Sequence, residues 1–113
     1  MLSKKLKWYP LFESVEKLEE LFVGKSVVVH RSMFGEALLL KDGGDYYAFK
    51  NKCPHQKKPL NDCKVIEGHV VCPFHRYRFS LENGRGHGLY LDQYQIKIEN
   101  NQVFIGMEKW SFF

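Results

Sequence analysis

Cysteine, proline and long apolar runs are all scarce in this sequence. The 113-residue chain has three cysteines and four prolines. So few cysteines, in an odd number, do not suit a disulfide scaffold, and metal or redox use is the better interpretation. No apolar run approaches the roughly 18 residues that a membrane-spanning helix needs. The basic start of the chain has no apolar stretch behind it and is not a secretory signal, so we expect a cytoplasmic protein without a membrane span.

Acidic residues are also outnumbered, since 17 Lys and Arg face 13 Asp and Glu, giving a formal net charge of +4. This excess is too small to indicate nucleic-acid binding by itself, and the aromatic residues follow no RNA-reading motif. We therefore expect no nucleic-acid partner. Apolar and aromatic residues are plentiful, at 44% and 15%. That composition excludes disorder and predicts one domain over residues 1–113, too short for a multidomain enzyme.

Short strands dominate the expected secondary structure. One short helix is predicted over residues 14–22, because Ser14 is a typical N-cap and apolar residues follow it at helical spacing. The alternating segment 94–98 turns at Asn100–Asn101 into 103–105, which predicts a hairpin. The other expected strands are residues 27–30, 37–40, 46–49, 69–71 and 78–81. Many short strands with regular turns favour an antiparallel β-sandwich or barrel.

Two segments of the chain combine cysteine with histidine. They read Cys53-Pro54-His55 and Cys72-Pro73-Phe74-His75, with sixteen residues between them. Each segment supplies one thiolate and one imidazole from a loop that proline stiffens. Four ligands of two kinds suit either one tetrahedral ion, such as zinc, or a cluster with two unlike irons.

The paired motif and its surroundings resemble the Rieske and Rieske-type ferredoxin proteins. Residues 68–71 lead into the second ligand segment as a strand does in that family, and residues 79–85 follow it in the family's manner. Trp8-Tyr9-Pro10 is similar to the entry into the Rieske domain of ring-hydroxylating oxygenases. The resemblance covers nearly the whole chain. It implies an all-β, Rieske-type antiparallel sandwich with a cluster-binding subdomain over about residues 51–82.

The resemblance further implies one 2Fe–2S cluster, with Cys53 and Cys72 on one iron and His55 and His75 on the other. Such a protein has no catalytic residue of its own. It would carry single electrons from a flavin-containing reductase to a terminal oxygenase or similar enzyme. Two alternatives stay open: a small Rieske subunit of a nitrite-reductase-like complex, and a structural zinc-binding interaction module that uses the same four ligands.

Several positions depart from the high-potential members of that family. Those members carry an extra cysteine in each ligand loop, where this chain has Lys58 and Phe74, so the resemblance implies no such disulfide. They also place Ser and Tyr where this chain has Tyr77 and Phe79. Fewer hydrogen-bond donors near the sulfurs stabilise the reduced cluster less, so we expect a potential of about −150 mV. Cys63 is expected to be an ordinary thiol.

Glycine is usual in the family at two further loop positions, where this chain has Lys57 and Arg76. Basic residues crowd both ligand loops, at Lys50, Lys52, Lys57, Lys58, Lys64, Arg76, Arg78 and Arg85. They form either a solvated surface or a basic rim that attracts an acidic redox partner. The remaining histidines have no ligand-spaced partners and are expected to be ordinary strand or loop residues; they are His30, His69 and His87.

Overall fold

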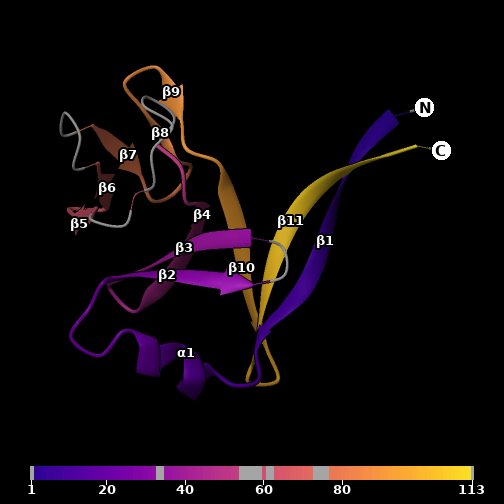
Figure 1. Ribbon diagram of the computed structural model, residues 1–113, viewed down its shortest axis with the longest axis horizontal. Helices are drawn as coiled ribbons and strands as arrows, with labels where there is room; N and C mark the ends of the chain where they lie inside the picture. The colour runs from indigo at the N-terminus through magenta and orange to yellow at the C-terminus, as the bar shows by residue number, and fades with distance from the viewer. Residues whose placement is uncertain (1, 33–34, 54–59, 61–62, 73–76, 113) are drawn as a thin grey trace.

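Antiparallel strands build almost all of the chain in the computed structural model, which describes residues 2–32, 35–53, 60, 63–72 and 77–112 (Figure 1). The strands are β1 (Leu2–Phe12), β2 (Val27–Ser32), β3 (Gly35–Asp42), β4 (Asp45–Lys50), β5 (Lys64–Ile66), β6 (His69–Val71), β7 (Arg78–Ser80), β8 (Arg85–Gly86), β9 (Leu89–Tyr90), β10 (Gln93–Glu99) and β11 (Gln102–Phe112). A six-stranded sheet has the order β1-β11-β10-β4-β3-β2, and β5-β6-β7 and β8-β9 form two smaller sheets. The predicted all-β architecture is confirmed.

The predicted helix is also confirmed, as α1 (Val15–Leu21). Ser14 is its N-cap, and the Ser14 Oγ accepts a hydrogen bond from the Lys17 N–H at 3.3 Å. Leu18 is buried on the inner side of the helix. In the part of the chain that the structure describes, no helix is both long and apolar enough to cross a membrane.

Strand β10 joins two halves of the large sheet. Its first residues, Gln93 and Tyr94, pair with β4, whereas the segment from Gln95 to Glu99 pairs with β11. Asn100 and Asn101 form the turn between β10 and β11 with φ of +51° and +67°. Asparagine tolerates this left-handed conformation, so the predicted hairpin is confirmed.

Strands β1 and β11 form a long two-stranded ribbon, which extends away from the rest of the sheet in Figure 1. Their register runs from Leu2 opposite Phe112 to Phe12 opposite Val103, with a bulge between Pro10 and Phe12. The sequence did not predict β1. Three lysines interrupt its apolar pattern, and its strand conformation depends on pairing with β11 at the other end of the chain.

The apolar core lies on both faces of β3. Successive side chains of a strand point to opposite faces, and all four residues from Ala37 to Leu40 are buried. On one face, Ala37 and Leu39 pack in a cluster with residues of α1 and β11. On the other face, Leu38 and Leu40 pack in a cluster that contains all three cysteines of the chain. The sheet therefore separates the helix from the cysteine-bearing loops.

Candidate metal centre

Cys53 and Cys72 meet inside the protein although they come from different loops. Cys53 lies three residues beyond the end of β4, and Cys72 directly follows β6. Both side chains are fully buried, and their Sγ atoms lie 3.4 Å apart. Two sulfurs bound at about 2.3 Å to one tetrahedral metal ion would lie about 3.8 Å apart. The two thiols are thus placed to bind a single ion after a small adjustment.

His55 and His75, the other two predicted ligands, lie outside the described residues, as do Lys57, Lys58, Phe74 and Arg76. For this reason no group of three or more potential metal ligands is found among the residues that the structure describes. None of the three cysteines forms a disulfide. Cys63 is buried in the same apolar cluster as the other two, with 6% of its surface exposed.

An apolar layer surrounds the two thiols. Phe49 from β4, Val70 from β6 and Phe79 from β7 are fully buried and belong to the same cluster as the cysteines. Leu60 and Leu81 complete this layer from the adjoining loops. Apolar surroundings exclude water from a metal site and lower the local dielectric constant, which influences the reduction potential of a bound group.

The second ligand loop, residues 72–77, is closed by a backbone hydrogen bond. The Cys72 N–H donates to the Tyr77 carbonyl oxygen at 2.7 Å, directly before β7 begins. Strand β7 pairs with β6 from Val71 opposite Arg78 to His69 opposite Ser80. The small sheet therefore fixes both ends of the segment that contains His75 in the sequence.

The β8–β9 hairpin contacts the end of this loop through His87. The His87 Nε2 accepts a hydrogen bond from the Arg78 N–H at 3.1 Å, and its ring stacks on Tyr77 with centroids 4.7 Å apart. Gly86 lets the hairpin approach, since an added Cβ there would lie 1.9 Å from the Arg78 carbonyl oxygen. Sequence reasoning assigned His87 no special role, because no residue spacing indicates a contact between a turn and a loop nine residues away.

The first ligand loop, residues 51–63, contains both side-chain and backbone hydrogen bonds. The Asn51 Oδ1 accepts from the Leu60 N–H at 2.7 Å, and the Cys63 N–H donates to the Leu60 carbonyl oxygen at 3.1 Å. The Asn51 amide Nδ2 also donates to Glu36 Oε1 at 3.2 Å. Arg31 and Asn51 together donate hydrogen bonds to the Glu36 carboxylate and hold its pKa below its usual value. Sequence reasoning also missed Asn51.

The described members of the predicted basic rim are all exposed; they are Lys50, Lys52, Lys64, Arg78 and Arg85. They come from the ends of β4, β5, β7 and β8, around the two ligand loops. Glu67 and Glu82 are the exposed acidic residues nearest to them in the sequence. Among the described residues from 50 to 85, five exposed basic residues thus face two exposed acidic ones.

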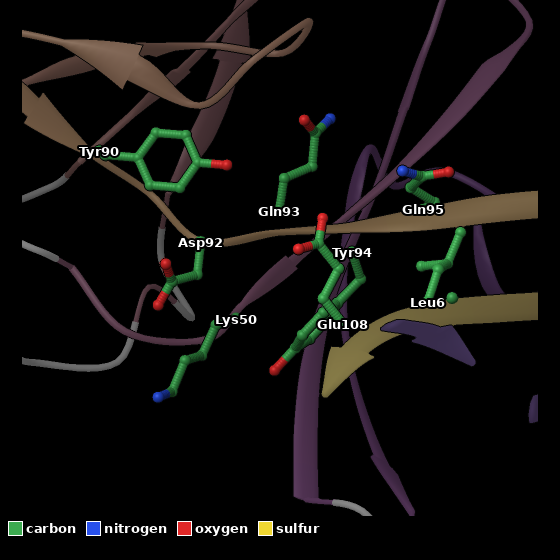
Figure 2. A pocket seen from close by; sticks show the side chains of 9 residues that line it. Leu6, Lys50, Tyr90, Asp92, Gln93, Tyr94, Gln95 and Glu108 are labelled. Atoms are coloured by element: carbon green, nitrogen blue, oxygen red, sulfur yellow. The ribbon is translucent and has the colours of Figure 1, made fainter. Parts of the chain in front are cut away.

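A separate cleft of about 250 Å³ opens where β11 diverges from β10 (Figure 2). It is lined by Leu6, Lys50, Tyr90, Asp92, Gln93, Tyr94, Gln95, Gly106 and Glu108. Tyr94 has its pKa raised by burial first and by Asp92 second. No cysteine or histidine is found among the described residues that line it, and the two buried thiols lie in a separate apolar cluster.

A protein-family model described as the Rieske [2Fe–2S] domain matches residues 7–93. Human apoptosis-inducing factor 3 is 36% identical over 80 residues, which are 67% of this chain and 13% of that protein. The ferredoxin component of the alkene monooxygenase system of Xanthobacter autotrophicus is 35% identical over 77 residues, covering 65% of this chain and 63% of that protein. The chain thus spans less than two thirds of either relative.

The solved ferredoxin of carbazole 1,9a-dioxygenase from Nocardioides aromaticivorans IC177 has the same fold. It matches with a TM-score of 0.68 at 21% identity, covering 85% of this chain and 95% of that chain.

Proposed function

This chain belongs to the Rieske [2Fe–2S] domain family, and we propose that it is a one-electron carrier that uses one 2Fe–2S cluster. The observation that carries the proposal is the pair of fully buried thiols, Cys53 and Cys72, whose Sγ atoms lie 3.4 Å apart. If the two thiols lay far apart, they could not bind one shared ion, even in a chain that matches the family. We favour the 2Fe–2S cluster over the structural zinc module, because the matching family is defined by a 2Fe–2S centre.

Four residues would hold the cluster in this proposal. Cys53 and Cys72 bind one iron through their thiolates, and His55 and His75 bind the other through their imidazoles. When bound, the cluster supplies a reversible one-electron couple. The small sheet, which spans residues 64–80, lies inside the cluster-binding subdomain that we assign to about residues 51–82.

The potential of the couple is proposed to be low, at about −150 mV. Phe79 supports this proposal, because it is fully buried in the same apolar cluster as both thiols and has no hydroxyl to donate to a sulfur. Tyr77 stacks its ring on that of His87, with ring centroids 4.7 Å apart. A redox titration that gives a potential above about +100 mV would overturn the assignment.

The proposed partners are a flavin-containing reductase and a terminal oxygenase or reductase. The relative from Xanthobacter autotrophicus is the ferredoxin component of an alkene monooxygenase system, and the fold neighbour is the ferredoxin of a dioxygenase. The exposed basic rim favours partners with acidic docking surfaces. In this role the chain passes electrons in the cytoplasm and has no catalytic residue.

Iron and acid-labile sulfide analysis, followed by electron paramagnetic resonance of the dithionite-reduced protein, tests the proposal. We expect two irons and two sulfides per chain and the low average g value typical of Rieske clusters. A zinc-only protein or an all-cysteine type of spectrum would contradict it. Purification from the native source separates the carrier from a nitrite-reductase-like subunit, because the subunit would remain bound to a large partner.

A further inference from the structure

Asn51 connects the end of β4 to the far side of the first ligand loop. It is half-buried and lies two residues before Cys53. Its Oδ1 accepts the hydrogen bond of the Leu60 N–H at 2.7 Å, and Leu60 itself is fully buried. A buried backbone N–H needs an acceptor, and removing that acceptor leaves the N–H desolvated and unsatisfied. One side chain therefore fixes both ends of a ten-residue segment that includes Cys53 and His55.

The β2–β3 hairpin determines how the Asn51 amide is oriented. Its Nδ2 donates to Glu36 Oε1 at 3.2 Å, so the Oδ1 is left to face Leu60. Arg31 in turn donates to Glu36 Oε2 from its Nε at 3.1 Å, as an ion pair across the β2–β3 register. Arg31, Glu36 and Asn51 thus form a continuous chain from the solvent to the ligand loop.

We propose that Asn51 is the positioning residue of the first ligand loop, and that Glu36 holds its amide in the working orientation. The inference rests on the proposed function, because it takes Cys53 and His55 as cluster ligands. Residues that orient the ligands of a metal strongly influence its retention and its electronic properties. The hydrogen bonds of Asn51 described above go to Leu60 and Glu36, so its effect on the ligands passes through the loop.

The hydrogen-bond pattern requires a neutral amide at position 51. An Asn51→Asp side chain has the same shape and keeps an acceptor for Leu60, but it places a carboxylate against the Glu36 carboxylate. Like charges at hydrogen-bond distance repel each other, and the donor to Glu36 is lost. Adding Glu36→Gln restores a donor and an acceptor between the two positions with the polarity reversed. Recovery of iron retention in this double variant would therefore show that the hydrogen bond between positions 51 and 36 is responsible.

The test compares cluster-loaded wild type with Asn51→Ala, Asn51→Asp and the Asn51→Asp/Glu36→Gln double variant. Asn83→Ala is the matched control, because Asn83 Oδ1 also accepts a backbone hydrogen bond, from the Arg85 N–H at 2.9 Å, away from the first loop. The measurements are the rate of iron transfer to a chelator and the g values and line widths of the reduced protein.

We expect both single variants at Asn51 to release iron about ten-fold faster or more, with broadened or shifted resonance lines. The double variant should release iron within about two-fold of the wild-type rate. Asn83→Ala should match wild type in both measurements. The Asn51→Asp comparison keeps the test valid if Asn51→Ala does not fold.

Spectra and iron release in Asn51→Ala that equal those of Asn83→Ala would overturn the inference. A double variant no better than Asn51→Asp would overturn the role of Glu36. Loss of the Rieske-type spectrum in wild type itself would instead contradict the proposed function, so the two failures are distinguishable.

Discussion

The Sγ atoms of Cys53 and Cys72 lie 3.4 Å apart, because the end of β4 and the end of β6 bring them together around one apolar cluster. A separation of this size is far longer than a disulfide bond of about 2.05 Å. It is close to the spacing of two thiolates that share one ion. In the proposed centre, two loops that are separate in the sequence thus supply the two thiolates of one iron.

Replacing Cys72 by Ser should abolish cluster binding, because one of the two thiolates on the shared iron is lost. Iron content should fall from about two per chain to background, and the resonance signal should disappear. Cys63→Ser is the matched control, since Cys63 is buried in the same apolar cluster but is not a proposed ligand. It should keep its iron and its signal. Equal iron loss in both variants would contradict the assigned ligand set.

Phe79→Tyr should raise the reduction potential. Phe79 packs in the cluster of buried residues that contains Cys53 and Cys72, so we expect a hydroxyl added there to donate to a sulfur. One hydrogen bond that favours the reduced state would raise the potential by about 20–60 mV. Spectroelectrochemical titration measures the change, and Phe79→Leu serves as the control that adds no donor. An unchanged or lowered potential in Phe79→Tyr would show that the hydroxyl does not reach the centre.

Gly86→Ala should destabilise the protein by about 3 kcal/mol or more, because the new Cβ would lie 1.9 Å from the Arg78 carbonyl oxygen and the backbone must move. Gly88→Ala has no heavy atom within 4 Å of its added Cβ, and only its positive φ of +73° opposes the change. It should cost about 1 kcal/mol. Urea unfolding compares the two variants. An equal decrease in the free energy of unfolding for Gly86→Ala and Gly88→Ala would mean that the β8–β9 hairpin does not pack tightly on β7.

Lowering the pH should destabilise the fold through His30. Burial lowers the pKa of His30 below its ordinary value of 6.5, and its ring lies 4.9 Å from that of Phe12. The neutral form is favoured in the folded state. The contribution of His30 to the free energy of unfolding is therefore fully present above about pH 6.5. It declines as the pH falls from there through the pKa of His30 in the folded state.

An NMR titration should show His30 changing charge below pH 6.5. Urea unfolding of His30→Gln should depend less on pH between about 7.5 and 5.5 than that of wild type. A His30 resonance that titrates above the ordinary value would contradict the burial effect.

Neutralising the exposed Lys52 and Lys64 with glutamine should slow oxidation of the reduced protein by an anionic metal complex. Attraction by the basic rim raises the local concentration of anions, so we expect up to about a ten-fold decrease at low ionic strength and little change at high salt. The control is Lys5→Gln/Lys7→Gln on β1, which removes the same charge from another surface. If both pairs slow the reaction equally, net charge rather than the rim is responsible.

Local signals in the sequence could predict the helix, the β10–β11 hairpin and the two buried thiols. Ser14 caps the helix because its hydroxyl oxygen can accept a backbone hydrogen bond. Asn100 and Asn101 suit the turn because asparagine tolerates a left-handed backbone. The spacing of Cys53 and Cys72 relative to histidine is likewise a short-range pattern. The helix cap and the hairpin turn depend on neighbouring residues alone, and each half of the ligand motif is local, whereas the meeting of Cys53 with Cys72 requires the fold.

Contacts between distant segments could not be predicted. Strand β1 exists because it pairs with β11 at the opposite end of the chain. Asn51 is of a residue type common in turns, and the sequence surroundings of Asn51 and His87 are those of ordinary loop residues. Their importance comes from accepting the backbone N–H groups of Leu60 and Arg78, which only the folded chain brings within reach.

The register of the β1–β11 ribbon has a practical consequence for attaching the protein to a surface. Leu2 is the pairing partner of Phe112, so the two ends of the chain emerge side by side, and in Figure 1 they lie on the opposite side of the view from β5, β6 and β7. A tether at either terminus would leave the same face of the molecule turned outward. A short linker could even join the two ends, with new termini opened in the loop between α1 and β2. An electrode coated through either end would therefore present the proposed redox centre to the solution.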